Sequence, residues 1–137
     1  MSVRKVRVLI GRFTLDGHDR GIFTVMNALK KAGMEVIYVH FNSPLEIVNS
    51  AIQEGVDVIG LTSSMGEHLL ACSVLMEELR KSELDIPVIV GGVVPTSDLP
   101  KLTEMGIKKV FGPGSKPEEA VSFISQISLK NRPTRKG

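Results

Sequence analysis

The feature of this chain that most constrains its fold is a regular alternation of short apolar runs with segments of helical periodicity. The runs are rich in β-branched residues, as expected of strands that are buried on both faces of a sheet. Alternating strands and helices joined by short connections require right-handed crossovers, which give a parallel sheet. The sequence therefore predicts an α/β protein with strands at residues 5–10, 34–39, 56–61, 87–90 and 108–111.

Between these runs, apolar residues recur at helical spacing, which predicts one buried stripe on each helix. The first three stripes comprise Ile22, Val25, Met26 and Leu29, then Ile47, Val48, Ala51 and Ile52, then Leu69, Cys72, Leu75, Met76 and Leu79. A short fourth helix has Thr96, Ser97 and Asp98 as candidate caps and ends at Gly106. The fifth is expected over residues 117–129, with Ala120, Ile124 and Ile127 facing inward.

The natural topology for this order is a flavodoxin-like (Rossmann-like) three-layer sandwich around a five-stranded parallel sheet, with strand order 2-1-3-4-5. That order puts the switch point between the first and third strands, where ligands bind in open α/β sheets. The segments that meet there are residues 11–21 and 62–67. Both are longer or more polar than a plain connection needs, so we expect a ligand at this edge.

The 137 residues fit one domain, which we expect over residues 1–129, followed by a flexible basic tail at 130–137. Lys and Arg total 17 against 15 acidic residues, so no broad basic field is available for a nucleic acid. Cys72 is the only cysteine and falls in an apolar helical pattern, which indicates a buried inert thiol. With no signal-peptide pattern and no membrane-length apolar segment, we expect a cytoplasmic protein without a membrane partner.

A polar loop follows the first predicted strand. It reads Leu15, Asp16, Gly17, His18, Asp19, Arg20 and Gly21. Two interpretations are open: Asp16 caps the next helix, or His18 binds a metal while Asp16 accepts a hydrogen bond from its other ring nitrogen. A protein-held site needs three or four ligands, and His40 and His68 lack carboxylate or thiolate neighbours at metal spacing. A single imidazole fits better with a metal that arrives inside a macrocycle.

Small and hydroxyl-bearing residues cluster where three predicted strands end. Gly60 ends the third strand, Gly91 and Gly92 follow the fourth, and residues 112–115 follow the fifth. Ordinary turn chemistry explains each group alone, but together they predict a slot in which a flat group approaches the backbone. The hydroxyls at residues 62–64 either bind a polar ring or a phosphate, or cap the following helix.

Other uses of this fold lack their motifs. No Gly-x-Gly-x-x-Gly follows the first strand, so a dinucleotide site is disfavoured, and neither a Walker loop nor a nucleophile elbow is present. A phospho-acceptor receiver needs an acidic pair after the first strand and an Asp at the end of the third. Gly11, Arg12 and Thr62 stand at those positions, which disfavours a receiver.

The loop Asp16-x-His18-x-x-Gly21, the hydroxyl turn at residues 62–64 and Gly91-Gly92 together resemble the cobalamin-binding domain of the B12-dependent mutases. The longer strings at residues 15–21 and 111–114 are similar to the acyl-CoA branch, which comprises methylmalonyl-CoA mutase and its isobutyryl-CoA and 2-hydroxyisobutyryl-CoA relatives. The resemblance extends from about residue 4 to residue 127.

The resemblance implies base-off, His-on cobalamin, in which His18 replaces dimethylbenzimidazole as the lower cobalt ligand and the displaced nucleotide tail enters the slot. Asp16 would then be the hydrogen-bond partner of His18. The implied cofactor-binding residues are Leu15, Asp16, Gly17, His18, Asp19, Arg20, Gly21, Thr62, Ser63, Ser64, Gly91, Gly92, Phe111 and Gly112. Two departures from the family are Ser64 in place of the usual Leu and Arg12 in place of a Lys that completes a relay with the Asp and His.

The resemblance also implies a function divided between two chains. In the family, adenosylcobalamin supplies a radical to an acyl-CoA held in a TIM-barrel domain, and 137 residues cannot contain that barrel. This chain would be the cobalamin-binding subunit of a carbon-skeleton mutase, an isomerase component that is inactive without its large subunit and carries no catalytic residue. Two alternatives stay open: a corrinoid carrier or B12 sensor, which typically adds a helical module before the first strand, and an interaction domain without a ligand.

Overall fold

The computed structural model describes residues 5–13, 20–41, 43–63, 68–92, 94–112 and 114–131. A parallel sheet of five strands has the order β2-β1-β3-β4-β5, which confirms the predicted topology. The strands are β1 (Arg7–Phe13), β2 (Glu35–Phe41), β3 (Val58–Ser63), β4 (Val88–Gly92) and β5 (Lys109–Phe111). The helices are α1 (Arg20–Lys31), α2 (Pro44–Glu54), α3 (His68–Lys81), η1 (Thr96–Asp98), α4 (Leu99–Met105) and α5 (Pro117–Asn131).

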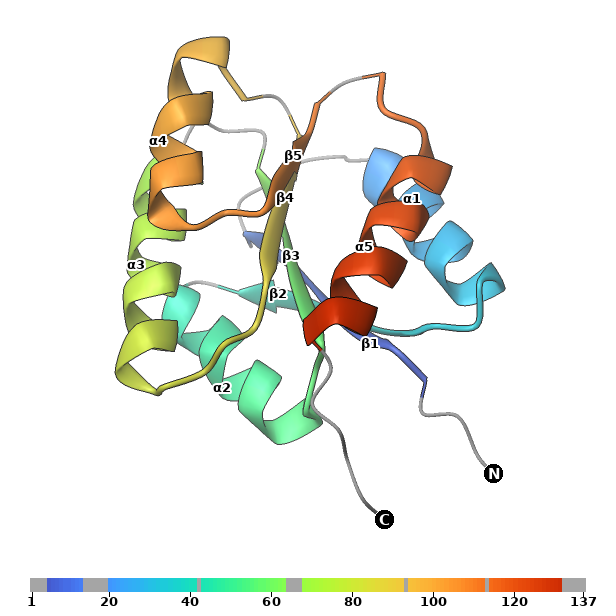
Figure 1. Cartoon of the computed structure of the whole chain (residues 1–137), viewed down its shortest axis with the longest axis horizontal. Helices are drawn as coiled ribbons and strands as arrows, with labels where there is room; N and C mark the ends of the chain where they lie inside the picture. The colour runs from blue at the N-terminus through green and yellow to red at the C-terminus, as the bar shows by residue number, and fades with distance from the viewer. Residues whose placement is uncertain are drawn as a thin grey trace.

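Three layers are visible in Figure 1, with α2, α3 and α4 on one face of the sheet and α1 and α5 on the other. Side chains alternate between the two faces along each strand, so each strand contributes to both halves of the core. Leu9 and Ile59 pack toward α2 and α3, whereas Ile10 and Ile89 pack toward α1 and α5. The sheet is therefore buried on both faces, as the continuous apolar runs predict.

The predicted helical stripes face the core with one exception. Ile47, Val48 and Ala51 of α2 are buried, but Ile52 is 54% exposed, so its assignment to the stripe is wrong. Ile52 lies one turn after Val48, at the flank of a stripe that is centred on Ile47 and Ala51. A spacing of four residues from a buried position therefore did not ensure burial.

Four strands, β1 to β4, extend farther at their carboxyl ends than the apolar runs predict. The residues at these ends were expected to come after the strands, but Gly11 lies within β1, Thr62 within β3, and Gly91 and Gly92 within β4. The reason is that ladder hydrogen bonds use the backbone and do not require an apolar side chain. Gly91, for example, pairs with Thr62 on one side and with Phe111 on the other.

The later helices differ from the prediction at their ends. The three candidate caps of the fourth helix form the 3₁₀ turn η1, and the last of them, Asp98, is the N-cap residue of α4 without a side-chain capping hydrogen bond. Gly106 ends α4 in a left-handed conformation with φ of 105°. The fifth helix runs to Asn131, beyond the expected end at residue 129. In the part of the chain that the structure describes, no helix has the length and apolar character needed to span a membrane.

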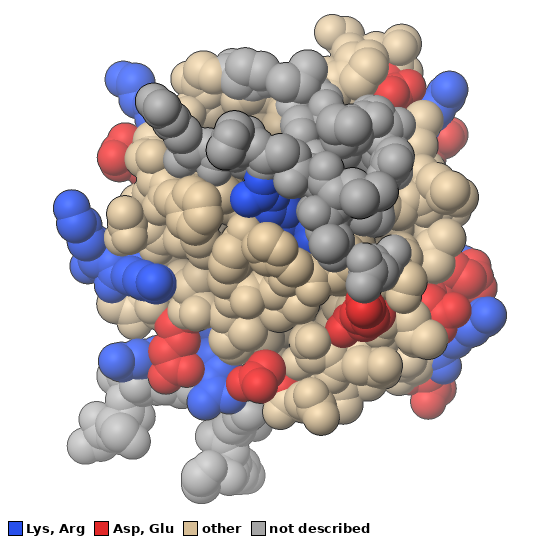
Figure 2. All heavy atoms as spheres, turned by 180° about the vertical axis from the view of Figure 1, so that it is seen from behind, with Lys and Arg blue, Asp and Glu red and all other residues tan. Residues whose placement is uncertain are grey.

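Acidic and basic side chains are mixed over the described surface, and Figure 2 shows both signs around the rear face. One exposed pair links neighbouring strands: Arg7 Nε of β1 donates to Glu35 Oε2 of β2 at 2.8 Å. Exposed pairs of this kind contribute little to stability. On that face the described charges form no field of a single sign.

Candidate functional site

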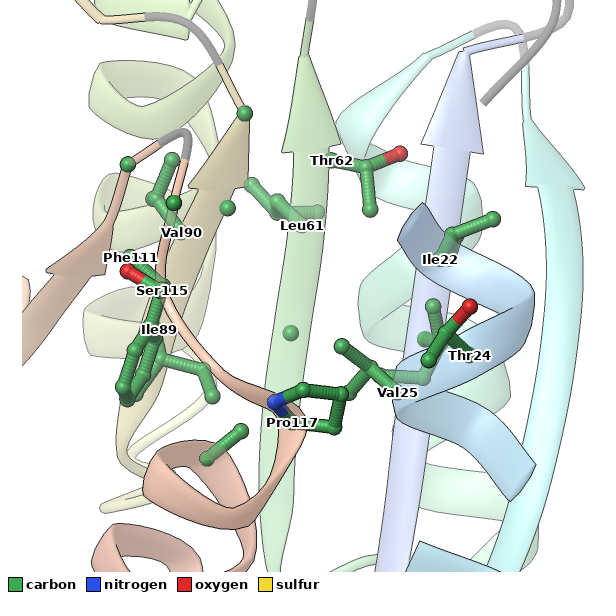
Figure 3. A pocket seen from close by; sticks show the side chains of 17 residues that line it. Ile22, Thr24, Val25, Leu61, Thr62, Ile89, Val90, Phe111, Ser115 and Pro117 are labelled. Atoms are coloured by element: carbon green, nitrogen blue, oxygen red, sulfur yellow. The ribbon is translucent and has the colours of Figure 1, made fainter. Parts of the chain in front are cut away.

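A cavity of about 420 Å³ opens at the carboxyl ends of β3, β4 and β5, between α1 and α5 (Figure 3). We call it the α1/α5 pocket. It brings together five of the residues that the sequence analysis selected, namely Thr62, Gly91, Gly92, Phe111 and Gly112. The predicted slot at this edge of the sheet therefore exists as a cavity.

Gly60 forms part of the pocket lining from the middle of β3, where it pairs with Ile10 and Ile89. A Cβ atom at this position would lie 3.0 Å from Ile10 Cδ1 and 3.6 Å from Ile89 Cγ1. Gly60 is absent from the residues with positive φ, so its backbone does not require glycine. Its missing side chain instead lets the terminal methyl group of Ile10 lie close to the strand and adds no bulk to the pocket wall.

Thr62 contributes a buried hydroxyl to the same pocket. The residue is only 9% exposed, and its Oγ1 has no hydrogen-bond partner among the residues that the structure describes. An unsatisfied buried hydroxyl costs about 1–3 kcal/mol. Such an atom in the wall of a pocket is a candidate contact for a polar atom of a ligand.

The rest of the pocket is apolar. Ile22 and Val25 come from α1, Ile89 from β4 and Phe111 from β5 (Figure 3). Thr24 and Ser115, the other described lining residues with a hydroxyl, are exposed residues. A cavity with apolar walls and few polar groups is typical of sites for organic ligands.

A hydrogen-bonded aromatic group lies on the edge strand next to β1. Arg12, 8% exposed, donates from Nη1 to Tyr38 Oη at 3.2 Å, and His40 Nε2 lies 3.1 Å from the same hydroxyl. The Tyr38 ring contacts the rings of Phe23 and His40 edge-on, with centroid distances of 5.8 and 5.1 Å. The sequence predicted that this strand ends at residue 39, but β2 runs to Phe41 and so includes His40.

Most of the loop that carries the candidate cobalt ligand lies outside the described residues, namely Leu15, Asp16, Gly17, His18 and Asp19. Ser64 also lies outside them. Arg20 and Gly21 begin α1, and Ser63 ends β3. Among the residues described, no group of three His, Cys, Asp or Glu could hold a metal ion. Cys72 is fully buried, and that burial raises the pKa of its thiol to about 12, in keeping with the predicted inert thiol.

The two side walls of the pocket, formed by α1 and α5, were not predicted from the sequence. Ile22 and Val25 of α1 and Ala120 of α5 were assigned to buried stripes, and Pro117 to a first helical turn. A stripe position that lines a cavity has the same periodicity as one that packs against a strand. The signals in the sequence came from the strand ends instead, namely the missing bulk at Gly60 and Gly91 and the hydroxyl at Thr62.

Comparison with known proteins gives consistent matches. Residues 6–122 match the B12 binding domain family. The chain is 41% identical to the pivalyl-CoA mutase small subunit of Xanthobacter autotrophicus, over 98% of this chain and 91% of that protein. It is 36% identical to the 2-hydroxyisobutanoyl-CoA mutase small subunit of Aquincola tertiaricarbonis, over 93% and 95%. A methylmalonyl-CoA mutase large subunit of Streptomyces virginiae is 33% identical, but the match covers 91% of this chain and only 18% of that protein.

Solved structures agree on the fold. A cobalamin-binding protein from Desulfitobacterium hafniense superposes with a TM-score of 0.74 at 18% identity, over 89% of this chain and 58% of that chain. The receiver domain of Francisella response regulator 1452 superposes with a TM-score of 0.71 at 15% identity, over 93% and 100%. At these identities the structures show the shared flavodoxin-like architecture alone, and the sequence relatives decide the family. The chain belongs to the B12 binding domain family, in the branch of the acyl-CoA mutase small subunits.

Proposed function

We propose that this chain binds adenosylcobalamin in the base-off, His-on form, with His18 as the lower cobalt ligand, and serves a separate large subunit in carbon-skeleton isomerisation of an acyl-CoA. The observation that carries the proposal is the α1/α5 pocket. It gathers Thr62, Gly91, Gly92, Phe111 and Gly112, which the resemblance implies as cofactor-binding residues, around one cavity. Family membership supplies the cofactor class.

The pocket fits the displaced base of the cofactor in shape and in polarity. The apolar walls and the absence of a side chain at Gly60 suit a flat aromatic ring, and the Thr62 hydroxyl can donate a hydrogen bond to a ring nitrogen. In the proposed complex, Asp16 accepts a hydrogen bond from the second ring nitrogen of His18, which fixes the imidazole tautomer. When bound, the cofactor supplies an organic radical by cleavage of its cobalt–carbon bond.

The division of labour is supported by the lengths of the relatives. Two of them are named small subunits of nearly the same length as this chain, whereas the same domain makes up 18% of the Streptomyces virginiae large subunit. The domain therefore occurs both as a separate chain and as part of a longer one. We propose that a TIM-barrel large subunit binds the acyl-CoA and that this chain, inactive alone, contributes the cofactor platform.

The proposal is tested by absorbance titration of the purified chain with hydroxocobalamin and with adenosylcobalamin. The wild type should give the spectrum of a His-ligated corrinoid, and His18→Ala should not. His40→Ala is the matched control, because its ring contacts Tyr38 on the edge strand and does not line the pocket. Absence of binding by the wild type, with and without a candidate large subunit, would refute the proposal. Methyl transfer without isomerisation in the reconstituted pair would favour a corrinoid carrier.

A further inference from the structure

We propose that the α1/α5 pocket selects the base of the nucleotide tail, accepting a benzimidazole and discriminating against a purine such as adenine. This inference rests on the proposed function, since it assumes that the tail enters the pocket. It adds a specificity that the family assignment does not contain. The selection follows from how few polar groups the buried wall offers.

Among the described lining side chains, Thr62 Oγ1 is the only buried polar atom without a hydrogen-bond partner. Thr24 and Ser115, the other described lining residues with a hydroxyl, are exposed. The strand backbone adds little, because β3 and β4 are interior strands whose polar groups are used in the sheet. Gly60 pairs with a neighbour on each side, and so does Gly91. Within the described part of the chain, the buried side chains of the pocket therefore offer a ligand one hydroxyl without a partner.

One hydroxyl matches the needs of a benzimidazole. Once one ring nitrogen is bonded to the ribose, a single acceptor nitrogen remains, and the Thr62 hydroxyl can donate to it. The rest of the ring, with any methyl groups on it, gains from burial against Val25, Ile89 and Phe111. Every polar atom of such a base is then satisfied.

Adenine does not match the same wall. Its further ring nitrogens and its exocyclic amine need several partners, and Thr62 can satisfy only one of them. Each remaining group loses its hydrogen bonds to water without replacement, which is the costly case for buried polar atoms. Both bases are flat and bicyclic, so a cavity of about 420 Å³ distinguishes them by polarity and not by size.

The test compares the dissociation constants of two corrinoids that differ only in the base, dimethylbenzimidazole or adenine, measured by titration of the wild-type chain. We expect binding of the adenine form to be weaker by at least about tenfold, which corresponds to about 1.4 kcal/mol. The tail-less corrinoid cobinamide gives the affinity without any base in the pocket. The adenine form should bind little better than cobinamide.

Adding a hydroxyl to the wall should reduce the selectivity. Val25→Thr keeps the shape of the side chain, and Ile89→Thr places a hydroxyl on β4 in case the α1 hydroxyl bonds to its own helix. Either variant should narrow the ratio of the two dissociation constants several-fold. Val74→Thr, on the outer face of α3 and 37% exposed, is the matched control and should leave the ratio unchanged.

The possible results separate this inference from the proposed function. Equal dissociation constants for the two corrinoids would overturn the selectivity and leave cobalamin binding intact. A ratio that stays the same in both folded wall variants would overturn the explanation by polarity. No binding of either corrinoid, nor of cobinamide, would defeat the proposed function itself.

Discussion

Replacement of Thr62 by Val should raise the stability of the ligand-free chain while weakening cobalamin binding. Val has nearly the same shape as Thr and also favours a strand, so the change removes little except the hydroxyl. In the ligand-free chain that hydroxyl is buried without a partner among the described residues. Its removal should therefore recover desolvation free energy.

The magnitude follows from the burial of Thr62. An unsatisfied buried hydroxyl costs about 1–3 kcal/mol, so the free energy of unfolding should increase by at least about 1 kcal/mol. For a domain of this size, that change raises Tm by roughly 4 °C. In the complex the variant lacks one hydrogen bond, which is worth about 0.5–1.5 kcal/mol, or an increase in Kd of roughly two- to twelvefold.

Thermal unfolding followed by circular dichroism measures the first effect, and titration with cobalamin measures the second. Thr62→Ser is the control, because it keeps the hydroxyl and loses a buried methyl group: it should lower the stability and retain most of the affinity. A Tm that falls in Thr62→Val would show that the hydroxyl is satisfied in the free protein. An unchanged Kd would show that the hydroxyl does not contact the ligand.

Three further outcomes are expected. Gly60→Val should keep the fold by circular dichroism but weaken cobalamin binding at least about tenfold, because the new side chain adds bulk to the pocket wall and pushes aside the terminal methyl group of Ile10, whose Cδ1 would lie 3.0 Å from the new Cβ; an unchanged Kd would contradict the role of Gly60. Gly11→Ala should lower the free energy of unfolding in urea by about 1–3 kcal/mol, since its Cβ would clash with Ile47 Cδ1, and an unshifted midpoint would count against this packing. Cys72 should react with a disulfide reagent at pH 8 only after urea is added, because burial raises its pKa to about 12 and the thiol is inaccessible. The free energy of unfolding should fall as the pH rises from about 9, because there only the unfolded chain ionises the thiol. Fast labelling of the native protein would contradict both expectations.

The topology and most of the core could be predicted from the sequence because hydrophobic periodicity reports burial directly. Ile47, Val48 and Cys72 are buried as expected, and the strand order follows from the crossover rule. Strand ends were less predictable. Thr62 and Gly91 lack the apolar side chains that mark a buried strand, although their backbones pair like those of their neighbours.

The candidate site could be predicted in part. Missing bulk at Gly60 and Gly91 indicated a slot, and the hydroxyl at Thr62 indicated a polar contact in it. The helix walls could not be predicted, because periodicity shows that Val25 and Ala120 turn inward but not whether a strand or a cavity faces them. Such a distinction depends on the distance between α1 and α5 across the sheet, which no local pattern encodes.

The two side walls of the α1/α5 pocket come from nearly opposite ends of the described chain, α1 from residues 20–31 and α5 from residues 117–131. A ligand held between them is in contact with both walls only while α5 is docked on the sheet. Binding should therefore suppress local detachment of this last helix, by about 2.7 kcal/mol at a ligand concentration of one hundred times Kd. Amide hydrogen exchange in α5 would slow accordingly. The cofactor would thus couple the stability of the first described helix, α1, to that of the last, α5.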